Sequence, residues 1–410
     1  MSGGAIRLAI AGCGVMGRRH VLGLGRLRAV GRVPFRLVAV CDPVGASAEA
    51  MADLAETTLG ERPAALPGLA DALATVAPRA VSVTTAPALH PAVAVPALAA
   101  GLDVMVEKPI ALTVGGGREI VAAARAAGRV LAVAENYRRD PVNRLAKALV
   151  GAGAVGRPHL ATQWSSAWGE RVVITPWRHR RAAGGIAVDM GVHYADILED
   201  LLGPAESLAG MGAVVDVERL GADGTRHPAD AEDLTVGVIR FASGALASWT
   251  LDLAGRGEEA FRRVVHGSGG SLEVPMDRTG APLRLVRWQG GSPVPVAPEE
   301  ILGLVPGFAL DPVTADLFGG ERLASYRLPW AETDANLLAV EYADFARAIA
   351  TGTPPEVDGA QGLRSLAIAY GLLESDRTGR RLRVDDLVAG SDSPYQAEID
   401  AGDRPERPTG

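Results

Sequence analysis

The sequence predicts an α/β protein: a doubly wound parallel sheet in the N-terminal part and a large, open, mixed or antiparallel sheet in the C-terminal part. Three observations support this prediction. The chain has 410 residues, more than a single hydrophobic core usually serves. Up to about residue 150, short apolar runs alternate with Ala-rich stretches of helix length. Beyond that point, strand-like runs follow one another with Gly-containing turns between them.

The alternation in the first part is typical of repeated βαβ units. A parallel sheet is covered on both faces, so its strands are apolar almost throughout. The predicted strands are Ile6–Ala11, Phe35–Cys41, Ala80–Thr84, Asp103–Val106 and Arg129–Ala134.

The residue pattern of the second part predicts a different sheet. One helix over 186–202 interrupts its strands, and two helices over 331–350 and 360–375 follow them. We therefore expect a dinucleotide-binding domain over 1–150, a second domain over 151–390, and a mobile tail over 391–410. The predicted strands of the second domain are His159–Trp168, Ser207–Leu220, Asp233–Phe241, Ala245–Leu253, Phe261–His266, Ser271–Val274 and Pro282–Trp288.

Composition excludes several classes of protein. The net charge is −7, so we predict no nucleic-acid partner, which would need clustered cations. We also predict no membrane span, because the most apolar window, 86–106, is broken by His90, Pro91, Pro96 and Asp103. We expect no secretory leader, since the first residues run straight into a strand pattern, and the two cysteines, Cys13 and Cys41, suggest no disulfide framework. We therefore expect a cytoplasmic protein.

The first predicted strand runs directly into the pattern G-x-G-x-x-G, formed by Gly12, Gly14 and Gly17. The first glycine permits a tight turn, the second lets the backbone approach a pyrophosphate, and the third lets helix and strand pack closely. The intervening Val15 and Met16 open the helix whose N–H groups would face the phosphates. This context predicts a dinucleotide cofactor.

The second predicted strand ends at Asp42. A carboxylate there would accept hydrogen bonds from the ribose hydroxyls and repel a 2′-phosphate, which favours NAD over NADP. Two observations leave NADP possible. The spacing between Gly17 and Asp42 is longer than usual, and Arg18 and Arg19 lie nearby and could assist NADP binding. The alternative is that Asp42 only caps the turn before Pro43.

Polar residues at two distant places are candidates for chemistry. Lys108 follows the strand that ends at Val106, so it would project from the carboxyl edge of the sheet, where such folds bind ligands. Asp189 and His193 are four apart on the helix over 186–202 and thus share one face. In isolation, such a pair is more often a structural hydrogen bond.

Taken together, these segments resemble the Gfo/Idh/MocA family of glucose-fructose oxidoreductase and inositol dehydrogenase. The resemblance covers about residues 6–375 and implies a Rossmann domain, a C-terminal sheet domain that commonly forms dimers or tetramers, and a cis bond before Pro109. The matching elements are Gly12 to Gly17 with His20, Thr84-Thr85-Ala86-Pro87 with His90, Glu107-Lys108-Pro109, Glu135-Asn136-Tyr137-Arg138, and Gly184 to His193.

The resemblance implies that Lys108, Asp189 and His193 converge beside the nicotinamide. His193 would accept the substrate's hydroxyl proton, with a pKa near neutrality. Lys108 would stabilise the developing alkoxide, and Asp189 would orient His193 or the substrate. The remaining expected cofactor contacts are Thr84, Thr85, Ala86, His90, Glu107 and Asn136, and the expected substrate contacts are Tyr137, Trp168, Trp177, Arg178 and His179.

The expected activity is hydride transfer between NAD(P) and a secondary alcohol or ketone carbon of a sugar, glycoside, nucleotide sugar or cyclitol, with no metal. Two alternatives use the same fold. One is a hydrolase or lyase that retains NAD and oxidises the sugar transiently. The other is a regulator that senses the dinucleotide without catalysis, although a sensor has no need of a proton-transfer set. Trp168 and Trp177 could equally pack between the domains.

Overall fold

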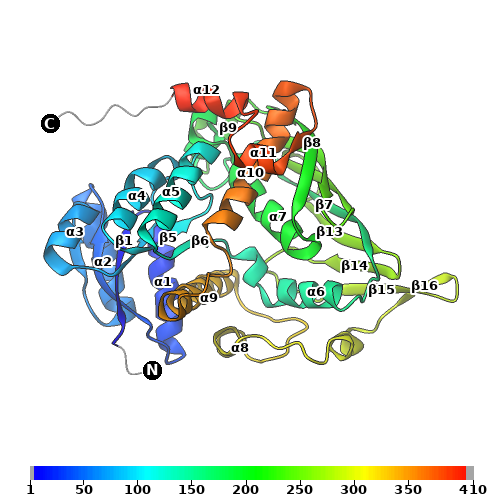
Figure 1. The fold of residues 1–410 in the computed structure, drawn as a ribbon, viewed down its shortest axis with the longest axis horizontal. Helices are drawn as coiled ribbons and strands as arrows, with labels where there is room; N and C mark the ends of the chain where they lie inside the picture. The colour runs from blue at the N-terminus through cyan, green and yellow to red at the C-terminus, as the bar shows by residue number, and fades with distance from the viewer. Residues whose placement is uncertain (1–3, 403–410) are drawn as a thin grey trace.

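The computed structural model describes residues 4–402, which form two large sheets and a small two-stranded one, with helices between and around the large sheets (Figure 1). The first sheet has six parallel strands in the order β3-β2-β1-β4-β5-β6. This confirms the doubly wound parallel sheet. Its strands are β1 (Ile6–Ala11), β2 (Phe35–Cys41), β3 (Ala64–Leu66), β4 (Ala80–Val83), β5 (Asp103–Glu107) and β6 (Leu131–Ala134).

Helices cover both faces of this sheet (Figure 1). The strand order reverses between β1 and β4, and the loops after these two strands therefore border the crevice where open α/β sheets bind ligands. The helices of this part are α1 (Val15–Ala29), α2 (Gly45–Leu59), α3 (Leu69–Val76), α4 (His90–Ala99), α5 (Val114–Ala127) and α6 (Pro141–Gly151).

The second sheet has nine strands in the order β16-β15-β14-β13-β7-β12-β11-β8-β17. Only β7 and β12 pair in parallel, so the sheet is mixed, as the sequence predicts. Its strands are β7 (Pro158–Trp168), β8 (Ala205–Ala213), β11 (Leu234–Phe241), β12 (Leu246–Gly255), β13 (Ala260–Gly267), β14 (Gly270–Val274), β15 (Arg284–Gln289), β16 (Ser292–Pro295) and β17 (Leu382–Arg383).

The predicted strand Ser207–Leu220 is two separate strands. β8 ends at Ala213, and β9 (Glu218–Leu220) pairs instead with β10 (Arg226–Pro228) in a small separate ribbon. The change of direction is held by Asp233, whose carboxylate accepts hydrogen bonds from the backbone N–H groups of Val215 and Asp216. Three of the four residues between the two strands, 214–217, are valines, so the apolar pattern runs on in the sequence and conceals the break.

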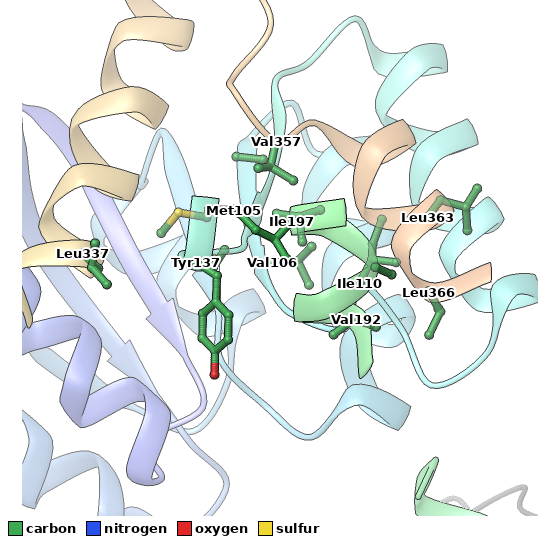
Figure 2. Packing of buried hydrophobic residues seen from close by; sticks show 14 of the residues in the cluster. Met105, Val106, Ile110, Tyr137, Val192, Ile197, Leu337, Val357, Leu363 and Leu366 are labelled. Carbon is green, nitrogen blue, oxygen red and sulfur yellow. The ribbon is translucent and has the colours of Figure 1, made fainter. Parts of the chain in front are cut away.

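Two long helices, α7 (Ile186–Leu202) and α10 (Gly359–Thr378), lie between the two sheets (Figure 1). Both are buried on nearly every side, because each packs against the nine-stranded sheet and against neighbouring helices. Figure 2 shows side chains from both parts of the chain in one buried cluster, including Val106, Val192 and Leu366. The core is therefore continuous across the junction.

Helix α9 (Trp330–Thr351) returns to the first sheet and packs along α1. A Cβ atom added at Gly23 of α1 would lie 2.7 Å from the Cβ of Leu338, so only glycine permits this approach. The ring of His20 lies 2.9 Å from the Tyr342 hydroxyl. The predicted domain boundary at residue 150 stays a prediction, because α9, which lies far beyond that residue in the chain, packs with helix α1 of the first sheet.

The expected mobile tail is wrong for the residues up to 402. Helix α12 (Pro394–Gly402) buries Tyr395 and Ile399, which are 1% and 3% exposed. Gln396 anchors it, because its side chain accepts a hydrogen bond from the Val114 N–H at 2.7 Å and donates one to Glu374 at 3.1 Å. Residues 403–410 lie outside the described part of the chain. The remaining helices are α8 (Pro312–Phe318) and α11 (Val384–Val388).

Candidate active site

The glycine-rich loop has the geometry that a pyrophosphate needs. Gly12 has a φ of +104°, and a Cβ atom there would lie 2.7 Å from the Thr85 nitrogen. A Cβ atom at Gly17 would lie 2.1 Å from the Gly12 carbonyl oxygen. At Gly14, by contrast, a Cβ atom would meet nothing within 4 Å. Protein atoms thus fill the space beside Gly12 and Gly17, whereas the space beside Gly14 is open. A ligand would approach the backbone at Gly14.

The N-terminus of α1 is left free of competing groups. Gly14 is the N-cap residue and has no side chain to bond the first N–H groups, and the first turn contains no acidic residue. Val15 at the head of the helix is 62% exposed, and Met16 is half-buried. These N–H groups can therefore bind an anion such as the pyrophosphate of NAD.

Asp42 does cap its turn, and it also ties that turn to the glycine loop. Its carboxylate accepts hydrogen bonds from the Cys13 N–H at 2.8 Å and from the Val44 N–H at 2.9 Å. The side chain is only half-buried, so the outward lone pairs remain open to ribose hydroxyls. The two interpretations of Asp42 are compatible.

The loop after β4 holds the glycine loop in place. The Thr84 hydroxyl donates to the Gly12 carbonyl at 2.7 Å, so this side chain positions the loop. Thr85 is half-buried and Ala86 is exposed, which leaves these two at the surface of the crevice.

Two expected cofactor contacts, His90 and Glu107, require correction because their side chains are buried and already bonded. The ring nitrogens of His90 face the carbonyl oxygens of Thr85 at 3.0 Å and Pro109 at 3.1 Å. Glu107 lies 2.8 Å from His20 and accepts a hydrogen bond from the Lys108 N–H at 3.0 Å. Both residues therefore brace the segment that carries Lys108, whose bond to Pro109 is cis, as the resemblance implies.

The acid–base candidates come together at the junction of the two parts. Lys108 Nζ lies 3.3 Å from Asp189 Oδ1 and 3.1 Å from the Asp189 carbonyl oxygen. His193 lies one turn further along α7. Burial disfavours the Asp189 carboxylate, but the charges of Lys108 and Arg178 outweigh it and lower the pKa of Asp189 below its usual value.

The partner of His193 is Glu135, which the sequence marks only as the first residue of the motif Glu135-Asn136-Tyr137-Arg138. Its two carboxylate oxygens lie 2.6 and 2.8 Å from His193 Nδ1. The expectation was that Asp189 orients His193 or the substrate; its carboxylate contacts Lys108 and Arg178, and no hydrogen bond joins it to His193 within residues 4–402. Glu135 directly follows β6, at the same carboxyl edge as Lys108, and that position was the available signal.

The expected pKa of His193 also requires correction. Burial lowers it well below the usual value, and the positive charges of Lys108 and Arg278 act in the same direction. Burial conversely raises the pKa of Glu135 to about 7. At neutral pH the His193 imidazole is thus neutral, as a proton acceptor must be.

Aromatic and cationic side chains border this group. The Tyr137 ring stacks on the His193 ring, with centroids 4.0 Å apart and planes inclined by 4°. Arg278 lies 4.8 Å from the Tyr137 ring and binds Asp334 at 2.8 Å. Arg278 follows β14 in an irregular loop with no motif, and nothing in the sequence marks it.

Of the other expected substrate contacts, Arg178 and Trp177 lie at the site. Arg178 donates to Asp189 at 3.3 Å, and its guanidinium lies 4.3 Å from the centre of the Trp177 ring.

Trp168 lines a separate surface hollow with Glu170, Leu220 and Arg256. Neither tryptophan packs in the core, since Trp168 is 42% exposed and Trp177 is 37% exposed.

His179 does not reach the site, and the expectation of a substrate contact there is wrong. It is 1% exposed, and its Nε2 accepts a hydrogen bond from the Val173 N–H at 2.9 Å. Asn136, at 6% exposure, has a carbonyl oxygen Oδ1 with no hydrogen-bond partner among the described residues, which leaves an acceptor available to a ligand.

Comparison with known proteins identifies the family. Residues 6–135 match the oxidoreductase family with an NAD-binding Rossmann fold, and residues 143–273 match the GFO/IDH/MocA C-terminal domain. The chain belongs to the Gfo/Idh/MocA family. It is accordingly an NAD-dependent oxidoreductase, and the glycine loop, the open first turn of α1 and Asp42 are the residues that fit this cofactor.

Relatives within the Gfo/Idh/MocA family act on sugars and cyclitols. The chain is 29% identical to 1,5-anhydro-D-fructose reductase of Ensifer adhaerens, over 75% of this chain and 80% of that protein. It is 24% identical to myo-inositol 2-dehydrogenase of Thermotoga maritima, over 75% and 80%. Levoglucosan dehydrogenase, solved with NADH and levoglucosan, has the same fold, with a TM-score of 0.73, 23% identity, and 93% and 100% coverage.

None of the helices between residues 4 and 402 is long and apolar enough to cross a bilayer.

Proposed function

We propose that this protein transfers a hydride between NAD and a secondary alcohol or ketone carbon of a sugar or cyclitol. The observation that carries this proposal is the contact between Lys108 and Asp189, because it joins the carboxyl edge of the NAD-binding sheet to the helix that bears His193. The substrates of the family relatives support the choice of a polyol ring.

The roles of the residues follow from their environment. Bound NAD would supply the nicotinamide carbon that accepts or donates the hydride. The Lys108 ammonium would stabilise the oxygen on the reacting carbon as charge develops. Neutral His193 would accept the hydroxyl proton, and Asp189 holds Lys108 and Arg178 in place. Trp177, Arg178 and the Asn136 carbonyl would contact the substrate or cofactor around them.

The proposal is tested by a panel of sugars, glycosides, anhydrosugars and inositols, each offered with NAD, NADP and their reduced forms. We expect an absorbance change at the nicotinamide band, with NAD preferred. Release of an aglycone without net consumption of NAD would identify the NAD-retaining hydrolase or lyase instead. Tight NAD binding without turnover of any compound would favour a sensing role.

We also propose that the nine-stranded sheet joins two copies of the chain, as a dimer or as half of a tetramer. Its face opposite α7 and α10 exposes Met211, Val236 and Trp164, and the strand register places these side chains in one row. Such a contiguous apolar surface is typical of interfaces. Light scattering on the wild-type protein and on Val236→Asp should show a shift from oligomer to monomer.

We further propose that the protein works in the cytoplasm. The buried free thiols of Cys13 and Cys41 support this, because secreted proteins of this composition more often pair their cysteines.

A further inference from the structure

Glu135 and His193 form a buried pair, and the roles above assign no part to Glu135. The exposed fractions of their side chains are 3% and 5%, and His193 Nδ1 lies within hydrogen-bond distance of both carboxylate oxygens. The two residues come from different elements, since Glu135 follows β6 and His193 lies on α7. The contact therefore depends on the junction of the two parts of the chain.

The surroundings fix the orientation of the ring. Tyr137 covers one face of the imidazole almost parallel to it. The Glu135 carboxylate is itself held by the Tyr137 N–H at 3.1 Å. Within residues 4–402, His193 Nε2 has no hydrogen-bond partner, so this nitrogen remains for a ligand while Nδ1 is engaged.

We propose that Glu135, and not Asp189, is the positioning residue of His193, and that it supplies the negative charge that allows this imidazole to accept a proton. The inference rests on the proposed function. When a secondary alcohol is oxidised, its O–H proton would pass to His193 Nε2, and bound NAD would take up the C–H hydrogen together with its bonding electrons as hydride. The Nδ1–H of the resulting imidazolium donates to the Glu135 carboxylate. Reduction of a ketone reverses each transfer.

The charges around the pair explain why a carboxylate is needed there. Lys108 and Arg278 both disfavour an imidazolium at His193, and burial does so too. An imidazole in this place without an adjacent anion would be a poor base. The titratable or charged groups that face the pair are Lys108, Arg138, Arg278, Glu107, Asp189, Asp196, Glu341 and Tyr137.

The direct test needs no substrate. The full-length protein with NADH bound is labelled with ¹⁵N-histidine, and the His193 signals are assigned from their loss in His193→Gln. At about pH 9, where Glu135 is ionised, we expect neutral His193 to carry its proton on Nδ1. Glu135→Gln should abolish this fixed tautomer and lower the pKa of His193. An Nε2–H tautomer in the wild-type protein at that pH would overturn the proposal.

Asp189→Asn is the matched control, because Asp189 lies on the same helix as His193 but contacts Lys108 and Arg178. We expect this change to leave the His193 tautomer intact. An equal effect of both substitutions, or an effect of Asp189→Asn alone, would return the positioning role to Asp189. Because this experiment reads the imidazole and not turnover, its outcome is independent of whether a sugar is the substrate.

Kinetics supply the second reading, with 1,5-anhydro-D-fructose and NADH as the first probe, or the best substrate of the panel if that compound is not turned over. Glu135→Gln should lower kcat about a hundredfold with little change in KM and displace the pH profile of kcat. Glu135→Asp, which keeps a carboxylate at greater distance, should restore part of the loss. A uniform loss in Gln and Asp variants with an unchanged pH profile would indicate a purely structural role.

Discussion

The Lys108 ammonium contacts Asp189 through both the side chain and the backbone of that residue, at 3.3 Å and 3.1 Å. Lys108 directly follows β5 of the first sheet, and Asp189 lies in the first turn of α7. The acid–base set therefore exists only when the two parts of the chain are docked.

Lys108→Ala should lower kcat at least about a hundredfold, since the ammonium stabilises charge on the reacting oxygen. NADH affinity, measured by fluorescence titration, should stay near that of the wild-type protein, because the pyrophosphate contacts lie at the glycine loop. His193→Ala should behave in the same way. Unchanged turnover in either variant would remove that residue from the mechanism.

Gly14→Ala and Gly17→Ala form a matched pair. The first should fold normally but bind NADH at least about tenfold more weakly, because its methyl group enters space left open for the pyrophosphate. The second should lower the melting temperature as well, since its Cβ atom would lie 2.1 Å from the Gly12 oxygen. Calorimetry measures the melting temperature of both variants and titration measures their NADH affinity. Together they show whether the added methyl group meets the ligand or the protein.

Asp42→Ser should shift the cofactor preference from NAD towards NADP. The substitution removes the charge that repels a 2′-phosphate, and we expect kcat/KM with NAD to fall about tenfold while that with NADP rises. An unchanged ratio of the two kcat/KM values would mean that Asp42 serves only the turns of Cys13 and Val44.

Glu341 should be a source of pH-dependent instability. It is 1% exposed, and neither carboxylate oxygen has a partner among the described residues. Burial raises its pKa well above the usual value. The folded protein therefore binds this proton more tightly than the unfolded chain, and stability is lost as pH rises from the unfolded pKa through the folded one.

Glu341→Gln should accordingly stabilise the protein relative to the wild type at pH 8 by about 1–3 kcal/mol and have little effect near pH 4. Urea unfolding at the two pH values measures the difference, with the exposed Glu119→Gln as the control. A gain that is equal at both pH values would contradict the ionisation argument.

The sequence predicts the fold well where local signals and packing agree. The G-x-G-x-x-G loop, the apolar strands β1 and β2, and α7 lie at or close to the predicted positions, since each has a strong pattern of its own. The sequence does not predict the short strands β3 and β17, because two or three residues are too few to show the alternation of apolar and polar residues that marks a strand. Helix α12 was missed because its stability comes from contacts with α10 and α5 and not from an amphipathic face.

For the site, residue type predicted the chemistry but not the pairing. Lys108, Asp189 and His193 were found from a motif and from helical spacing, yet the spacing also suggested the wrong partner for His193. Two residues four apart on a helix share a face without being bonded. His90 and His179 were misassigned because a histidine beside a motif and a buried structural histidine look alike in sequence. The difference lies in burial, which depends on the whole fold.

The packing of α9 on α1 has a consequence for synthesis. The surface of α1 around Gly23 stays uncovered until residues near Leu338 have left the ribosome, by which time most of the chain has been made. The NAD-binding sheet, although first in the nascent chain, therefore completes its packing among the last, and a chain truncated before residue 330 would present an unfinished apolar surface to chaperones and proteases.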